Sequence, residues 1–246
     1  GVSNRPGVSN SPSLANVAYQ PYLLREGGVP TIEMQALVPV QEHNEFDFNI
    51  LLVAERLNSD SAYTRMALEA YGRVPDAFVI TRALANFERS LLSGNSAFDQ
   101  YTQSNNHAAM TTEQVRGMNL FFSSRTSCTT CHNGFNFTNY AFENNGLYDV
   151  YDDPGRQRLT GKEEDRALFK VPGLRNVDLT APYMHDGSMA TLEQVVAHYQ
   201  SGGHNHPHKN AVLKPLDLSP SEQNDLVAFL KSLTDDTFVN NPLFKK

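Results

Sequence analysis

The sequence contains only two cysteines and no tryptophan among its 246 residues. Two cysteines are too few for a four-cysteine zinc site. No apolar run approaches the ~18 residues that a membrane-spanning helix needs, and the run at residues 50–54 is far too short. The formal net charge is −7 without any cluster of Lys and Arg, which argues against a nucleic-acid-binding surface. We therefore expect no membrane span and no nucleic-acid partner.

Hydrophobic residues make up 40% of the chain, which suits a globular protein of one or two domains. Apolar residues recur at three- and four-residue intervals, the period of an α-helix. This period predicts helices over residues 47–58, 62–71, 75–92, 111–122, 191–199 and 219–233. The polar segment 93–109 predicts an interdomain linker, with the boundary near Asn105. The expected fold class is all-α, with domains at residues 1–105 and 106–246.

The most informative motif is the run Cys128-Thr129-Thr130-Cys131-His132. Its spacing matches the covalent attachment of a c-type haem, because two thiols three residues apart can reach the two vinyl groups of a porphyrin. The adjacent His132 is then placed beneath the iron. The alternatives are half of a zinc site, a thioredoxin-like dithiol or a chance spacing, and no thioredoxin-like βαβ pattern surrounds the motif. Residues 133–180 are rich in Gly, Asn and Asp, so we expect them to wrap the haem as loops.

Further motifs lie on both sides of the cysteines. They are Asn10-Ser11-Pro12-Ser13-Leu14, Glu33-Met34-Gln35-Ala36-Leu37, Asn86-Phe87-Glu88-Arg89, Asp153-Pro154-Gly155-Arg156, Phe169-Lys170-Val171-Pro172-Gly173-Leu174-Arg175-Asn176 and Leu179-Thr180-Ala181-Pro182-Tyr183-Met184-His185-Asp186-Gly187-Ser188. In this order they resemble the bacterial dihaem cytochrome c peroxidase family, which includes the MauG-like enzymes. The resemblance runs from residue 1 to about residue 235.

Members of that family carry two covalent haems in two all-α, cytochrome c-like domains, and this sequence has only the second attachment motif. The resemblance implies that residues 1–105 are the remainder of the N-terminal, peroxide-reacting haem domain. Residues 106–246 would be the C-terminal cytochrome c domain. The first haem is then expected upstream of Gly1 or on a separate chain. If that haem has been lost, the protein is instead a monohaem c-type electron-transfer protein.

The resemblance implies an acid/base role for Glu45, which stands at the family's spacing from Gln35. A carboxylate beside peroxide can move a proton from the inner to the outer oxygen and so make water the leaving group. Gln35 and Pro39 match neighbouring pocket positions. The alternative is that Glu45 is a solvated loop acid in an acidic segment. His43 is a nearby competitor for proton transfer.

The second axial ligand distinguishes two branches of the family. The peroxidases have a methionine in the helix after the His-Asp-Gly motif, whereas the MauG-like branch has a tyrosine, and Tyr199 occupies that position. Helical spacing places Tyr199 with apolar neighbours, so it points inward. The alternatives are a core tyrosine bonded to backbone, or thioether ligation by Met184. A phenolate is a harder and more negative ligand than a thioether, so it stabilises higher oxidation states.

Two weaker patterns concern metal ions. Asn10, Thr180 and Pro182 match family positions that offer oxygen ligands to calcium, although a capping Asn and a turn Pro explain the same residues. His204, His206 and His208 resemble a metal cluster. Because a loop with Gly and Pro holds these histidines, a solvent-exposed loop is the preferred interpretation.

The resemblance implies a periplasmic enzyme that reacts with hydrogen peroxide and oxidises a redox protein or a protein substrate. Many relatives have a tryptophan between the two haems, at a position that aligns with Arg25. Because this chain has no tryptophan, an electron passing between haems needs another route, such as tyrosine side chains or the haem edges.

Overall fold

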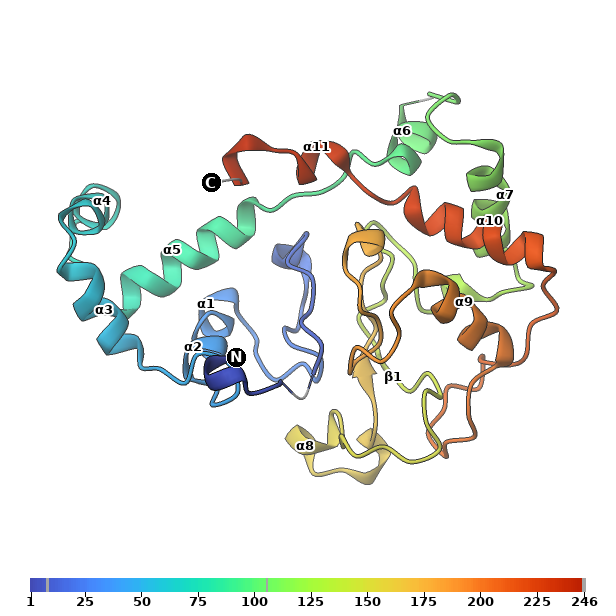
Figure 1. Ribbon diagram of the computed structural model, residues 1–246, viewed down its shortest axis with the longest axis horizontal. Helices are drawn as coiled ribbons and strands as arrows, with labels where there is room; N and C mark the ends of the chain where they lie inside the picture. Colours follow the sequence, from blue (N-terminus) through green and yellow to red (C-terminus); the bar gives the residue numbers. More distant parts are fainter. Residues whose placement is uncertain (8, 105, 245–246) are drawn as a thin grey trace. The chain divides into compact units, whose positions relative to one another are not determined.

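The computed structural model describes residues 1–7, 9–104 and 106–244 (Figure 1). Helices dominate the described part of the chain, and its two strands are short. The chain divides into two compact units. The first comprises Gly1–Val8, Val17–Leu24 and Gly28–Leu91, and the second comprises Ser9–Asn16, Arg25–Gly27 and Leu92–Lys246.

The first unit is a small helical domain. Its elements are η1 (Val2–Asn4), η2 (Val17–Tyr19), α1 (Ile32–Gln35), α2 (Leu37–Gln41), α3 (Ile50–Asn58), α4 (Ser61–Tyr71) and α5 (Ala77–Ser90). A side chain caps each of the three longer helices, because Asn49, Asp60 and Asp76 each accept a hydrogen bond from a first-turn amide. The core is formed by buried residues of η2, α1, α5 and the segment between them: Val17, Leu23, Val29, Ile32 and Ala85.

The second unit contains the remaining elements. They are α6 (Ala97–Gln103), α7 (Thr112–Phe121), η3 (Cys128–Thr130), β1 (Phe142–Glu143), α8 (Gln157–Thr160), η4 (Glu163–Asp165), β2 (Phe169–Lys170), η5 (Val177–Leu179), α9 (Leu192–Ser201), α10 (Pro220–Lys231), α11 (Asp236–Val239) and η6 (Pro242–Phe244). The two strands pair antiparallel, with Phe142 opposite Lys170. Long loops connect these short elements, as expected for residues 133–180.

Helices α7 and α10 pack closely against each other in the second unit (Figure 1). They approach closely because Gly117 has no side chain, and a Cβ at this position would lie 1.8 Å from the Asp225 carbonyl oxygen. Arg116 reinforces the crossing with two hydrogen bonds to the Asp225 carboxylate, at 2.8 and 2.7 Å. Phe121 and Phe229 pack beside it with ring centroids 5.0 Å apart. This core supports the segment that follows α7, which carries the two cysteines.

The polar segment predicted as a linker instead contains α6. Ser96 and Asp99 form a capping box that starts this helix. Asp99 also makes a buried ion pair with Arg175, with N–O distances of 2.7 and 2.9 Å. This pair ties α6 to the second unit, and the chain passes between the units at Leu91–Leu92. The expected boundary residue, Asn105, lies outside the described residues.

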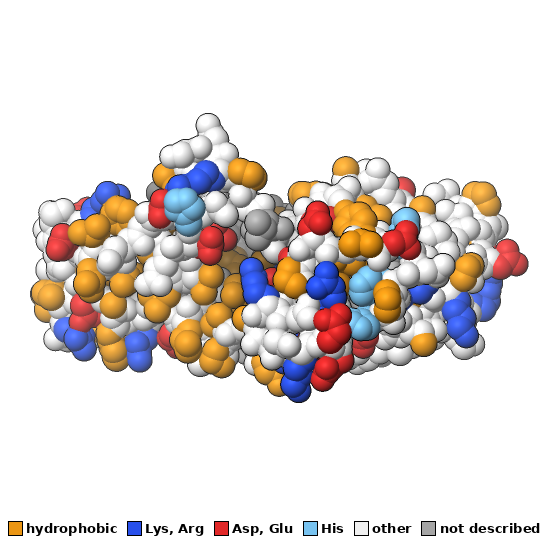
Figure 2. Space-filling model, turned by 90° about the horizontal axis from the view of Figure 1, so that it is seen from below, with side chains coloured by type: hydrophobic (Ala, Val, Ile, Leu, Met, Phe, Trp, Pro, Cys, Tyr) orange, Lys and Arg blue, Asp and Glu red, His pale blue; other side chains and the backbone are white. Residues whose placement is uncertain are grey.

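Each of the six predicted helices has a counterpart in the structure: α3, α4, α5, α7, α9 and α10. The predicted start at Asp47 was too early, because Asn49 caps α3. The sequence period missed the short helices α1, α2, α8 and α11, which have too few turns to show one. In the described part of the chain, none of the helices has the length and hydropathy to cross a membrane. On the face drawn in Figure 2, basic and acidic side chains are interspersed.

Candidate haem site

A tight turn after α7 presents the two cysteines. The Thr126 hydroxyl donates to the Leu120 carbonyl at 2.7 Å, and Ser127 adopts a left-handed φ of 54°. The chain then enters η3, where the His132 amide donates to the Cys128 carbonyl at 2.9 Å. Local hydrogen bonds therefore hold the whole motif between the end of α7 and His132.

The orientation of the His132 ring is set by the backbone. Its Nδ1 lies 2.9 Å from the Phe137 carbonyl oxygen, which can only accept, so Nδ1 carries the proton. The neutral ring then has its lone pair on Nε2, as in histidines that bind metals. Burial lowers the pKa of His132, although hydrogen bonds to the Phe137 and Pro172 carbonyls oppose this shift. The proton on Nδ1 and the lowered pKa both favour a neutral imidazole whose Nε2 can bind iron.

The thiols of Cys128 and Cys131 are both free of disulfide bonds. Burial raises the pKa of Cys128, and burial with the nearby Glu143 raises the pKa of Cys131 to about 11. A dithiol used in disulfide exchange has a lowered pKa, so these environments disfavour a thioredoxin-like function. Half-buried thiols on one turn suit thioether attachment instead.

Tyr199 lies on α9, which begins at a capping box between Thr191 and Gln194. Burial raises the pKa of the Tyr199 phenol, a hydrogen bond from the Asn145 side chain lowers it, and the Cys131 and Cys128 thiols raise it again. The hydroxyl therefore lies near the two cysteines of the attachment motif and has a side-chain partner in Asn145. Its role as an iron ligand stays a prediction.

Met184 reaches the same neighbourhood from the loop before α9. The Asn145 amide donates to the Met184 sulfur at 3.4 Å. Met184 has a left-handed φ of 72°, a conformation that is uncommon for a residue with a side chain. Both ligand candidates, Met184 and Tyr199, are therefore neighbours of Asn145.

The residues present fit haem c. Two thiols and an imidazole with an available nitrogen come from one turn, and a phenol near this turn comes from α9. This is the donor set of a covalently attached, axially ligated haem.

The chain is similar to known proteins of one family. The family model for di-haem cytochrome c peroxidase matches residues 1–107. The methylamine utilization protein MauG of Methylorubrum extorquens is 34% identical over 232 residues, covering 93% of this chain and 65% of that protein. The cytochrome-c peroxidase IdrP1 of Denitromonas iodatirespirans is 32% identical, covering 92% of this chain and 68% of that protein.

A solved structure is also similar over nearly the whole chain. The crystal structure of a MauG-like protein associated with microbial copper homeostasis superposes with a TM-score of 0.91 at 30% identity, covering 99% of this chain and 80% of that chain. The chain belongs to the di-haem cytochrome c peroxidase family. The recognition made from the motifs is thereby confirmed. The chain spans about two thirds of the length of the curated relatives, at 65% and 68%.

The residues that the family resemblance assigned to peroxide chemistry lie in the first unit. Gln35 ends α1, Pro39 lies in α2, and Glu45 is exposed in the loop that follows. The Phe46 amide donates to the Pro39 carbonyl at 3.1 Å, which folds this loop back onto α2. The buried Gln35 Oε1 has no hydrogen-bond partner among the described residues. The role of Glu45 stays a prediction.

His43, the competitor of Glu45, is also exposed. Its ring lies 2.8 Å from the Arg5 guanidinium and 3.2 Å from the Asp47 carboxylate. These surface contacts engage both nitrogens of the imidazole.

The possible calcium ligands are only partly brought together. The Asn10 amide donates to the carbonyl oxygens of Pro182 and, at 3.3 Å, of Met184. Thr180 is exposed, and its hydroxyl donates to the Val177 carbonyl at 3.0 Å. A calcium role for these residues stays a prediction.

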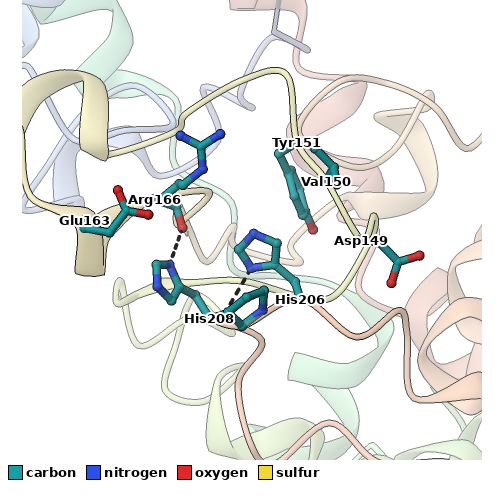
Figure 3. A pocket seen from close by; sticks show the side chains of 8 residues that line it. Asp149, Val150, Tyr151, Glu163, Arg166, His206 and His208 are labelled. Atoms are coloured by element: carbon teal, nitrogen blue, oxygen red, sulfur yellow. Dashed lines mark hydrogen bonds between the residues drawn. The ribbon is translucent and has the colours of Figure 1, made fainter.

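Of the three histidines of the loop after α9, His206 and His208 are neighbours, with ring centroids 5.4 Å apart. His204 is exposed and lies 3.0 Å from Asp149, whereas the ring of His208 contacts the Arg166 carbonyl oxygen at 3.0 Å. His206 and His208 line a pocket of about 210 Å³ together with Tyr151 (Figure 3). Across the described residues, no group of three His, Cys, Asp or Glu side chains could hold a metal ion.

Asn145 was not expected at the site from its local sequence. It lies in an Asn-Asn-Gly run, which predicts only a turn. Its contacts with Tyr199 and Met184 cross long stretches of chain, so local sequence carries no sign of them.

Proposed function

We propose that this protein acts as a dihaem c-type peroxidase, which reacts with hydrogen peroxide and oxidises a redox protein or a residue of a protein substrate. The observation that carries this proposal is the set formed by Cys128, Cys131, His132 and Tyr199 within the second unit. The names of the relatives, which include MauG and cytochrome-c peroxidase, support it.

When bound, haem c supplies an iron centre that exchanges single electrons. Cys128 and Cys131 would form the thioether links, and the Nε2 atom of His132 would bind the iron. The Phe137 carbonyl holds the His132 ring in place through Nδ1. Tyr199 would be the second axial ligand, and its phenolate would favour the ferric state and lower the potential.

A dihaem enzyme needs a second haem besides the one at Cys128 and Cys131. We place the peroxide-reacting haem on an upstream segment or a separate chain, with the first unit, which ends at Leu91, forming the remainder of its domain. Glu45 would hold the proton that moves from the inner to the outer oxygen of peroxide. The unpartnered, buried Oε1 of Gln35 supports a binding role nearby, since such an atom is costly unless a ligand or water satisfies it.

Two finer features belong to the same proposal. We place the protein in the periplasm, because c-type haem attachment occurs outside the cytoplasm in most bacteria. A calcium ion would take oxygen ligands from Asn10, Thr180 and Pro182.

The test uses the complete protein, matured with its haems. Its intact mass should show two covalent haems, and peroxide should drive oxidation of a reduced small redox protein. A single haem, combined with redox exchange that is indifferent to peroxide, would instead establish a monohaem electron carrier.

A further inference from the structure

The second unit contains an aromatic cluster made of Tyr148, Tyr151, Phe169 and His185. The rings of Phe169 and His185 are stacked, with centroids 4.0 Å apart and an interplanar angle of 22°. Tyr151 lies 5.6 Å from His185, and Tyr148 lies 5.4 Å from Tyr151. Tyr151 is only 4% exposed, whereas Tyr148 is half-buried, so the cluster leads from the interior to the surface.

The hydroxyls of the two tyrosines have different partners. The Tyr148 hydroxyl donates to the Asp186 carboxylate at 2.6 Å. The Tyr151 hydroxyl accepts from the Leu147 amide at 2.7 Å, and it faces the amide oxygen of Asn144 only at 3.5 Å. A carboxylate can take a proton, but an amide oxygen at that distance cannot. Of the two tyrosines, only Tyr148 has a proton acceptor in place.

We propose that Tyr148 is a redox-active residue, which gives one electron to the oxidising equivalents of the peroxidase and its phenolic proton to Asp186. It would then present a neutral tyrosyl radical to one-electron donors at the surface. This inference rests on the proposed function for its oxidant. The donor class is a reduced redox protein or another one-electron reductant.

The step balances without a further reactant. The phenolic O–H bond of Tyr148 breaks, and an O–H bond forms on the Asp186 carboxylate. The electron goes to the oxidant, so Tyr148 is oxidised and the oxidant is reduced. A donor at the surface then returns one electron, and Asp186 returns the proton. The Ser188 amide donates to the other Asp186 oxygen at 3.0 Å and holds the carboxylate in position.

The cluster also reaches the proposed haem site. The Tyr151 hydroxyl lies 3.5 Å from Asn145 Oδ1, and the Asn145 side chain hydrogen-bonds to Tyr199. Tyr148 is therefore joined to the proposed iron ligand through two intervening side chains. Because the chain has no tryptophan, its tyrosines are the side chains best suited to carry an oxidising equivalent outward.

The test uses the complete haem-loaded protein, with ring-deuterated tyrosine, and electron paramagnetic resonance of rapidly frozen samples. One arm adds hydrogen peroxide. The other arm generates tris(bipyridine)ruthenium(III) with a light flash and needs no peroxidase activity. Both arms compare the parent with Tyr148→Phe and Asp186→Asn. The control is Tyr63→Phe, which removes the hydroxyl of a tyrosine outside the cluster that is 49% exposed.

We expect both arms to give a tyrosyl signal that narrows on deuteration. Tyr148→Phe and Asp186→Asn should each lose most of it, while Tyr63→Phe keeps it. Absence of the signal in the ruthenium arm, its survival in Tyr148→Phe, or full yield in Asp186→Asn would overturn the proposal. A Tyr148 signal in the ruthenium arm without one in the peroxide arm would support the redox role and count against the peroxidase function. Unchanged ferric spectra check that the variants fold.

Discussion

Tyr199 and Met184 share a hydrogen-bonding partner in the side chain of Asn145. The amide donates to the Met184 sulfur at 3.4 Å and also hydrogen-bonds to the Tyr199 hydroxyl. Two side chains with very different preferences for iron thus lie around one polar group. The Cys131 and Cys128 thiols act on the pKa of the Tyr199 phenol, so its hydroxyl lies near the attachment motif. The choice of Tyr199 over Met184 as the iron ligand stays a prediction.

Haem attachment should depend on both thiols. We expect the Cys128→Ala, Cys131→Ala double variant to lose covalent haem from this polypeptide, because no other cysteine can form a thioether. A denaturing gel stained for haem measures this directly. Persistence of the stain on the double variant would remove the haem assignment.

Replacement of Tyr199 by Phe should leave the haem attached but open the sixth coordination site. Loss of a phenolate should change the ferric spectrum and raise the reduction potential. Spectroelectrochemistry measures both, with Met184→Leu as the matched control. An unaltered Tyr199→Phe spectrum, together with an altered Met184→Leu spectrum, would transfer the ligand to Met184.

Glu45→Gln should slow the reaction with peroxide in the complete two-haem protein. The amide keeps the size of the side chain but has no mobile proton, so we expect a loss of about 10²- to 10⁴-fold. Stopped-flow mixing with peroxide measures the rate. Glu42→Gln is the control for a nearby exposed acid. A Glu45→Gln rate within about threefold of the parent would identify Glu45 as a solvated loop acid.

Asp99→Ala should destabilise the second unit strongly. The side chains of Asp99 and Arg175 are 3% and 4% exposed, so the variant leaves a buried guanidinium without its partner. Such a loss costs about 3–5 kcal/mol. The exposed pair Arg65–Glu69 provides the control, because Glu69→Ala should cost less than about 1 kcal/mol. Urea unfolding monitored by circular dichroism measures the free energy of unfolding of Asp99→Ala and Glu69→Ala. Equal losses in the two variants would contradict a strongly stabilising role for the buried ion pair.

The same carboxylate should make stability depend on pH. Burial by itself would raise the pKa of Asp99, but hydrogen bonds from Arg175 and Ser96 outweigh it and hold the pKa below its ordinary value. The stabilisation is therefore complete above the unfolded pKa of about 3.9 and is lost as the pH falls through the lower folded pKa. The free energy of unfolding of the parent should fall in this range more steeply than that of Asp99→Asn. An equal dependence on pH in the parent and in Asp99→Asn would contradict a lowered pKa for Asp99.

The helices show how far local pattern reaches. Helix α5 could be predicted because its apolar period repeats over several turns, and α9 and α10 because their capping boxes are local. Helix α6 could not, since its polar sequence is held by the ion pair of Asp99 with Arg175, which comes from far along the chain. A polar linker and a short helix held by a distant residue can have the same composition. The local sequence alone therefore does not distinguish them.

The sequence by itself determined the motif at Cys128, Cys131 and His132. Two thiols that reach the two vinyl groups of one porphyrin lie close together in the chain, so the motif is local. Only the tertiary structure decided which side chains face this motif. Tyr199 lies near it because α9 packs against α10. Asn145 joins Tyr199 to Met184 through contacts between distant segments. Such contacts depend on how helices and loops pack, and packing is set by the whole core rather than by any local run of residues.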